Sequence, residues 1–189
     1  MKTLIQKINY STEVKKSNFL AFLIPYEDFD SQMKKLKQEH TKAVHFVFAY
    51  RIFKQGQIIE RFSDDGEPKG SSGMPILNVI RGYSLVNVAA IVVRYFGGVL
   101  LGVGGLVRAY TQSVVECIKN ADSGVFLDFL EKEKLVIQCD YSSLNRVKYL
   151  AKIHHIEIFH QEFLVDFVDV TLEGSRGNLE KFSLAMKNL

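Results

Sequence analysis

The first two thirds of the chain alternate between short apolar segments and polar connections. Four segments are rich in β-branched and aromatic residues, as β-strands are. These are 3–10, 18–26, 43–53 and 57–63. A fifth, VNVAAIVV at 86–93, is apolar on both faces, which predicts a central strand covered on both sides. Three further segments carry apolar residues at steps of three and four, as helices that face a core do. These are 28–40, 74–82 and a third that begins at Gly104 or Gly105 and ends at 121.

The last third has a different order of elements. The pattern predicts a strand, a helix, a hairpin of two strands and a final helix. These elements are 134–140, 142–153, 155–161 with 163–174, and 177–189. The order βαββα predicts most of a ferredoxin-like unit whose closing strand is missing. Because the turn residues ADSG at 121–124 precede this unit, we expect two domains of the α+β class, 1–124 and 125–189.

Composition narrows the class of protein. Hydrophobic residues make up 47% and charged residues 24% of the chain, which favours ordinary globular domains. The longest apolar run is too short to span a bilayer, and the N-terminus does not resemble a signal peptide, so we expect a cytoplasmic protein without membrane contact. Cys117 and Cys139 form no metal-binding or disulfide pattern and are predicted to be buried thiols.

The positive charge is concentrated in the first domain. Residues 1–124 contain 16 Lys and Arg against 11 Asp and Glu, whereas the remaining residues contain 8 against 10. Any attraction to phosphate is therefore expected in the first domain.

The segment RYFGGVLLGVGGLVRAY at 94–110 joins the central strand to a long helix and contains five glycines. Free backbone N–H groups at a helix start attract anions, and Arg94 and Arg108 are placed to add charged hydrogen bonds. The segment lacks the lysine of a Walker A loop, and Val107 replaces the last glycine of a dinucleotide fingerprint. The alternative, that the glycines only permit tight packing of strand and helix, stays open.

A second polar loop, SDDGEPKGSSG at 63–73, precedes the helix at 74–82. Its acids Asp64, Asp65 and Glu67 are candidates for holding Mg²⁺, with a turn of solvated acids as the favoured alternative. His45 is interpreted as a hydrogen-bonded core residue rather than a base.

Arginines and lysines interleaved with aromatic residues indicate contact with RNA phosphates and unpaired bases. The residues predicted to bind an anion or nucleic acid are Arg94, Tyr95, Phe96, Gly97, Gly98, Gly102, Gly104, Gly105, Arg108, Arg61 and Lys69.

Three segments together resemble the IMPACT family in order and spacing: HFVFAYR at 45–51, ERFSDDGEPKGSSGMPIL at 60–77 and IVVRYFGGVLLGVGGLVRAY at 91–110. The resemblance implies a first domain like domain 2 of ribosomal protein S5 and a ferredoxin-like second domain like the last domain of elongation factor G. Eukaryotic members of this family are regulators of translation. The chain departs from the family pattern at Val99, Leu100 and Val103, where relatives carry threonine, lysine and threonine.

These observations favour a non-enzymatic, translation-related protein that binds RNA or the ribosome through the basic, glycine-rich surface of its first domain. No catalytic residue and no cofactor is predicted, and the oligomeric state is left open. One alternative is an enzyme acting on a phosphorylated small molecule with the acidic loop holding Mg²⁺. Another is a module that binds a protein partner.

Overall fold

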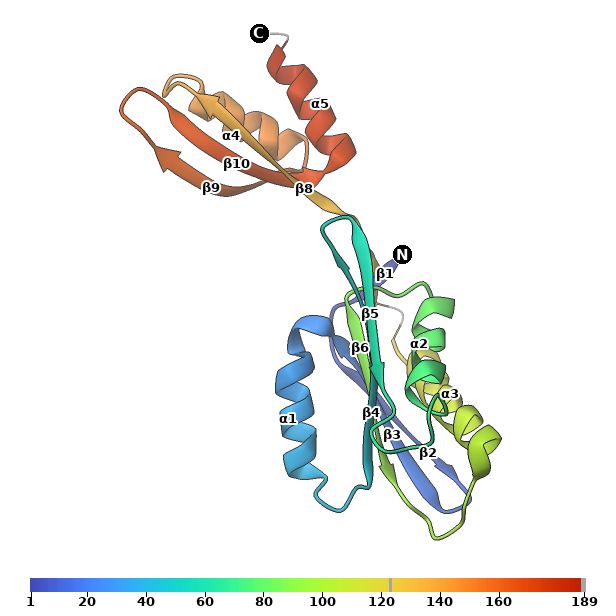
Figure 1. The fold of residues 1–189 in the computed structure, drawn as a ribbon. Helices are drawn as coiled ribbons and strands as arrows, with labels where there is room; N and C mark the ends of the chain where they lie inside the picture. Colours follow the sequence, from blue (N-terminus) through green and yellow to red (C-terminus); the bar gives the residue numbers. More distant parts are fainter. Residues whose placement is uncertain (123, 188–189) are drawn as a thin grey trace. The chain divides into compact units, whose positions relative to one another are not determined.

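The computed structural model describes residues 1–122 and 124–187, which form two compact units divided between Phe129 and Leu130 (Figure 1). Each unit has its own buried core. Part of the turn predicted at 121–124 and the last two residues of the predicted final helix lie outside the described residues.

The first unit is built on one antiparallel sheet with the strand order β2-β3-β6-β4-β5. Its strands are β2 (Ile8–Val14), β3 (Ser17–Pro25), β4 (His45–Lys54), β5 (Gln57–Ser63) and β6 (Val88–Tyr95). The prediction of a central strand is confirmed, because β6 lies in the middle and its first seven residues are all buried. Residues Val88, Ala90 and Val92 face one core, and the residues between them face a second.

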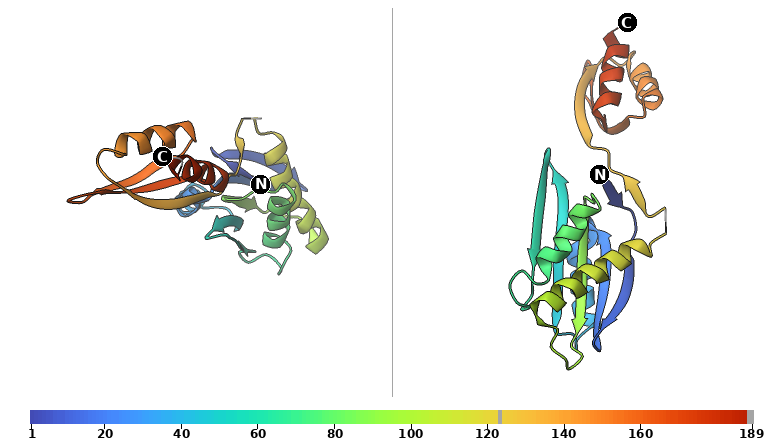
Figure 2. Two further views of the ribbon diagram at one scale, coloured as in Figure 1. Left: turned by 90° about the horizontal axis from the view of Figure 1, so that it is seen from above. Right: turned by 90° about the vertical axis from the view of Figure 1, so that its right-hand side faces the viewer.

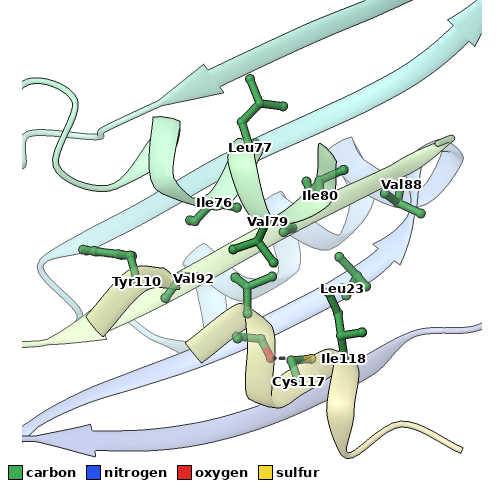
Figure 3. Close-up of a cluster of buried hydrophobic side chains, with 14 of the residues drawn as sticks. Leu23, Ile76, Leu77, Val79, Ile80, Val88, Val92, Tyr110, Cys117 and Ile118 are labelled. Carbon is green, nitrogen blue, oxygen red and sulfur yellow. Dashed lines mark hydrogen bonds between the residues drawn. The ribbon is translucent and has the colours of Figure 1, made fainter. Parts of the chain in front are cut away.

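Helices cover both faces of this sheet. A short 3-10 turn (Tyr26–Asp28) leads into α1 (Phe29–Glu39) on one face, and α2 (Gly73–Gly82) and α3 (Gly102–Lys119) cover the other (Figures 1 and 2). Figure 3 shows side chains of α2 and α3 packed against Leu23, Val88 and Val92 of the sheet. Within this core the Cys117 thiol lies 3.8 Å from the Ala21 carbonyl, and burial raises the pKa of Cys117 to about 11.

The sequence prediction is wrong at the N-terminus. Segment 3–10 is not one strand: β1 (Lys2–Leu4) pairs with β7 (Phe126–Asp128), while β2 starts separately at Ile8. Strand β2 continues to Val14 and returns into β3 through Lys15 and Lys16, both at positive φ. Such a two-residue turn matches the twist of a hairpin.

Several boundaries also differ from the prediction; β10 (Val168–Ser175), for example, begins at Val168 rather than at residue 163. Helix α3 begins at Gly102, earlier than the predicted start at Gly104 or Gly105, because Gly102 has a φ of 71° and turns the chain into the helix. The first unit extends to Phe129 rather than to residue 124, because β7 pairs with β1 and Val125 is buried in the first core.

The second unit contains β8 (Lys132–Cys139), α4 (Leu144–Ile153), β9 (Glu157–Phe163), β10 (Val168–Ser175) and α5 (Arg176–Lys187). The predicted order βαββα is confirmed for the described residues, and the strands form an antiparallel sheet in the order β8-β10-β9. Val168, Val170 and Leu172 of the middle strand pack with buried residues of α4 and α5. Both units mix helices with antiparallel sheet; their assignment to the named S5-like and ferredoxin-like folds stays a prediction.

Within residues 1–122 and 124–187, no helix is both long and apolar enough to cross a lipid bilayer.

The pairing of β7 with β1 leads to a test of the unit boundary. A fragment of residues 1–129 should unfold at a higher temperature than a fragment of residues 1–124, because the shorter one loses β7 and the buried Val125 side chain. Burial of one such side chain stabilises a fold by about 2 kcal/mol, so we expect a difference of roughly 5 °C or more by circular dichroism. Equal melting temperatures would show that β7 does not stabilise the first unit.

Candidate functional site

Three neighbouring strands bring together a row of side chains beneath helix α3. Phe19 on β3 and His45 on β4 both lie directly opposite Arg94 on the central strand β6. Arg94 lies over the Phe19 ring, with its guanidinium carbon 5.5 Å from the ring centroid. The row is thus set by strand register, which no local sequence motif encodes.

Glu67, from the loop between β5 and α2, contacts both this row and helix α3. Its Oε1 accepts hydrogen bonds from Arg94 Nη1 at 2.5 Å and from the Tyr110 hydroxyl at 2.7 Å. The Glu67 and Arg94 side chains are only 4% and 6% exposed. Burial, and then the hydrogen bond to Glu67, raise the pKa of Tyr110, so the phenol stays protonated and acts as a donor. The three groups form a buried, internally neutralised cluster, the Glu67–Arg94–Tyr110 cluster.

His45 adjoins this cluster through its other ring nitrogen. Its Nδ1 lies 2.7 Å from the Asp65 carbonyl oxygen, and because a carbonyl only accepts, Nδ1 carries the proton. Its Nε2 lies 3.9 Å from Glu67 Oε2, too far for a hydrogen bond. The expectation of a hydrogen-bonded histidine therefore agrees with the contacts, although the side chain is 22% exposed rather than fully in the core.

The burial of Arg94 corrects the sequence-based picture of two arginines facing one anion. Arg94 points into the unit and its charge is neutralised by Glu67, whereas Arg108 is exposed on α3. The two arginines also line different pockets. Arg94 is buried because the register of β6 turns it toward α3, where the carboxylate of Glu67, itself hydrogen-bonded by Tyr110, neutralises its charge.

The acids of the loop at 63–73 have separate protein partners. The Asp64 carboxylate accepts hydrogen bonds from the backbone N–H groups of Gly70, Ser72 and Gly73 and from the Ser72 hydroxyl. Burial raises the pKa of Asp64, but these hydrogen bonds outweigh burial and lower it overall. Asp65 Oδ2 accepts the Phe46 N–H at 2.6 Å. The carboxylates of Asp64 and Asp65 therefore hold this loop in one conformation.

This arrangement bears on the magnesium alternative. Asp64, Asp65 and Glu67 each have a different set of donors, so they do not converge on one point. Among residues 1–122 and 124–187, no group of three or more His, Cys, Asp or Glu side chains is placed to hold a metal ion.

The glycine-rich connection after β6 has specific backbone requirements. A Cβ at Gly97 would lie 2.0–2.3 Å from backbone atoms of Lys16 and Ser17, so the connection packs directly on the turn between β2 and β3. Gly98 and Gly102 have φ values of 81° and 71°, which other residues rarely adopt. Gly104 and Gly105 lie inside α3 without such a φ. A structural role for these glycines thus has direct support at Gly97, Gly98 and Gly102.

Two pockets flank the start of α3, and both include Leu101 in their walls. The basic pocket, of about 580 Å³, is lined by Lys15 and Arg108 over an apolar floor of α3 and β2 residues. The second pocket, of about 380 Å³, has His45, Glu67 and Arg94 among its lining residues together with apolar side chains. We call the second one the His45 pocket.

The remaining predicted residues are dispersed. Tyr95 packs with the core under α1, and its hydroxyl lies 2.9 Å from His40 Nδ1. Arg61 lies opposite Tyr50 on β4, whose side chain belongs to that same core, so Arg61 is on the other face of the sheet from Arg108. Phe96 lines the His45 pocket, and the exposed Lys69 follows Pro68 of its wall.

The first unit matches a known protein family. Residues 15–118 match the Impact N-terminal domain, which covers both polar loops and the buried cluster between them. The chain belongs to the IMPACT family. An IMPACT family member of Haemophilus influenzae is 37% identical, over 92% of this chain and 84% of that protein. The Escherichia coli IMPACT family member YigZ is 32% identical, over 73% of this chain and 68% of its own length.

A solved crystal structure, described only as a hypothetical protein, is similar over the whole chain. It has a TM-score of 0.76 at 26% identity and covers 99% of this chain and 91% of that one. The fold of this IMPACT family member therefore has a counterpart of the same extent among solved structures.

Sequence reasoning misses two parts of this site. The periodicity of α3 places Tyr110 on the apolar stripe of the helix. It does not show that the Tyr110 hydroxyl donates a hydrogen bond to Glu67. The polar character of Lys15 predicts a connection, but it does not show that this lysine lines the basic pocket with Arg108. The turn at Lys15 and Lys16 is recognisable only once the register of β2 and β3 is known.

The glycine requirements give a matched pair of substitutions. Gly97→Ala should destabilise the first unit by about 3 kcal/mol, because its Cβ meets backbone that cannot rotate away. Gly104→Ala should stabilise it by about 0.5–1 kcal/mol, because this site is helical and open around the new Cβ. Urea unfolding measures both, and equal effects would contradict the packing of the connection on Lys16 and Ser17.

The buried cluster gives a second test. Arg94→Ala should cost about 3–5 kcal/mol of unfolding free energy, because it leaves the Glu67 charge buried without its cation. Tyr110→Phe keeps the ring against Phe19 and removes only one hydrogen bond to a charged group, which costs about 1.5–3 kcal/mol. A loss under 1 kcal/mol for Arg94→Ala would argue against a buried ion pair.

Proposed function

We propose that the first unit is a non-enzymatic, translation-related module that binds RNA, with the ribosome as the RNA source to test first. The observation that carries the proposal is the basic pocket. Lys15 and Arg108 share it, none of its lining residues is Asp or Glu, and no salt bridge engages either cation within the described parts of the chain. Cations without a protein partner are available to phosphates.

The backbone of the adjacent turn supports the same assignment. Lys15 and Lys16 have φ values of 47° and 66°, a conformation in which hairpin turns favour asparagine and glycine. Holding a residue other than glycine there costs about 1–2 kcal/mol. Lysine at both positions therefore lowers the stability of the first unit but places two exposed positive charges beside the basic pocket.

The surroundings of the basic pocket add to its positive potential. Helix α3 starts beside it, at Gly102, and has no acidic residue in its first turn. The positive end of the helix dipole is therefore not offset locally. Two acids of the loop at 63–73 are engaged elsewhere, because Glu67 is paired with Arg94 and Asp64 is bound by backbone N–H groups.

The link to translation rests on family membership. The match to the Impact N-terminal domain over residues 15–118 includes Lys15, Lys16 and Arg108. Because the eukaryotic members that the sequence resembles regulate translation, ribosomal RNA is the first candidate for the bound nucleic acid. The alternative of a magnesium-dependent enzyme is weakened, since the three acids of its presumed metal site have other partners.

The experiment is binding of the purified protein to ribosomes and to a ten-nucleotide single-stranded RNA over a salt series. The double variant Lys15→Ala/Arg108→Ala should bind more weakly and should reduce the slope of log K against log salt by about 0.7 for each phosphate that is no longer neutralised. The control is Lys34→Ala/Lys54→Ala, which removes the same charge from exposed positions on α1 and at the tip of β4.

If the control variant bound RNA as weakly as Lys15→Ala/Arg108→Ala, only net charge would matter for binding. That result would reject the basic pocket as the binding site. Absence of binding by the wild-type protein at low salt would reject the RNA-binding function. Ribosome binding that survives nuclease treatment and high salt would point instead to a protein partner.

A further inference from the structure

The His45 pocket combines an apolar rim with a polar floor, and the buried cluster explains only part of that floor. Its rim carries exposed apolar side chains: Val44, Phe96, Leu100 and Val103 are 54%, 49%, 84% and 58% exposed. Exposed apolar groups gathered around one cavity mark a binding surface. The volume of about 380 Å³ is within the range of pockets for small ligands or single chemical groups.

The polar floor brings together hydrogen-bonding atoms of three side chains. His45 Nδ1 donates to the Asp65 carbonyl, and its Nε2 stands 3.9 Å from the acceptor Glu67 Oε2, too far for a hydrogen bond between them. Among the described residues, Nε of the buried Arg94 is a donor without a partner. Buried polar atoms are nearly always paired in native proteins, so the Arg94 donor calls for an acceptor. A ligand edge in this pocket would also meet the His45 ring and the Glu67 carboxylate.

The charge of the floor limits the class of ligand further. Glu67 and Arg94 neutralise each other, so a phosphate group would meet the Glu67 carboxylate and an ammonium group would meet the Arg94 guanidinium. A neutral, planar group with apolar faces and a polar edge avoids both penalties. Phe96 on the rim offers an aromatic face for stacking, already flanked by Arg94 at 5.7 Å from the ring centroid.

We propose that the His45 pocket takes an unpaired nucleobase of single-stranded nucleic acid. The base stacks among the apolar rim side chains and its polar edge meets His45, Glu67 and Arg94 on the floor. The inference rests on the proposed function, because the phosphates on either side of the base need cations. Arg108 is across Leu101 in the basic pocket, and Lys69 follows Pro68 of the wall.

The test compares two oligonucleotides of ten nucleotides with the same backbone charge, one of single-stranded RNA and one in which every base is absent. Stacking of one base is worth about 1–3 kcal/mol, so the wild-type protein should bind the RNA about 5- to 150-fold more tightly than the abasic strand. The double variant Phe96→Ser/Leu100→Ser should bring this ratio close to one without changing the salt slope, because both side chains are exposed and uncharged.

Two further variants distinguish base binding in the His45 pocket from binding elsewhere on the surface. Lys15→Ala/Arg108→Ala should weaken binding of both strands and leave their ratio unchanged. Ile58→Ser/Tyr83→Ser replaces two exposed large hydrophobic residues, 41% and 38% exposed, outside the pocket and should leave the ratio at the wild-type value. Melting temperatures of all variants establish that each is folded.

The outcomes discriminate the two proposals. If the wild-type protein binds both strands equally, or if Phe96→Ser/Leu100→Ser keeps the wild-type ratio, the nucleobase pocket is wrong while RNA binding through the cations stands. If neither strand binds at low salt, RNA binding fails and the nucleobase pocket fails with it.

Discussion

The buried carboxylate of Glu67 holds the first unit together at the point where its three kinds of element meet. It joins the central strand through Arg94, helix α3 through Tyr110, and its own loop to both. The ring of Tyr110 is in turn packed edge-on against Phe19, with centroids 5.1 Å apart. A buried carboxylate is stable only when all of its hydrogen-bond and ion-pair partners are in place. The loop at 63–73 is therefore restricted to one conformation.

The conformation of that loop decides what the surrounding surface can bind. Asp64 is bound by the loop backbone and Glu67 by Arg94, so both carboxylates are engaged within the first unit. The basic side chains Lys15 and Arg108 are then opposed by no carboxylate in their pocket. An acidic sequence segment thus lies beside a positively charged surface without cancelling it.

The start of α3 separates two environments of different chemistry. On one side of Leu101 the pocket is basic, and on the other the rim is apolar around a neutralised floor. The apolar rim includes Leu100 and Val103. Arg108 supplies positive charge on the other side. Such a pair of environments suits a ligand with a charged backbone and flat, neutral side groups.

The sequence by itself determined most of the helices and strands, the central position of β6 and membership of the IMPACT family, since these depend on local periodicity and on residues close together in the chain. The direction of Arg94 was decided only by tertiary structure, because register across three strands turns it toward Tyr110 and Glu67. Pairing between β1 and β7, more than 120 residues apart, was equally invisible to local patterns. Hydrogen bonds and ion pairs between distant residues have no spacing in the sequence, so which charges are buried and which are free is settled only when the sheet and its helices come together.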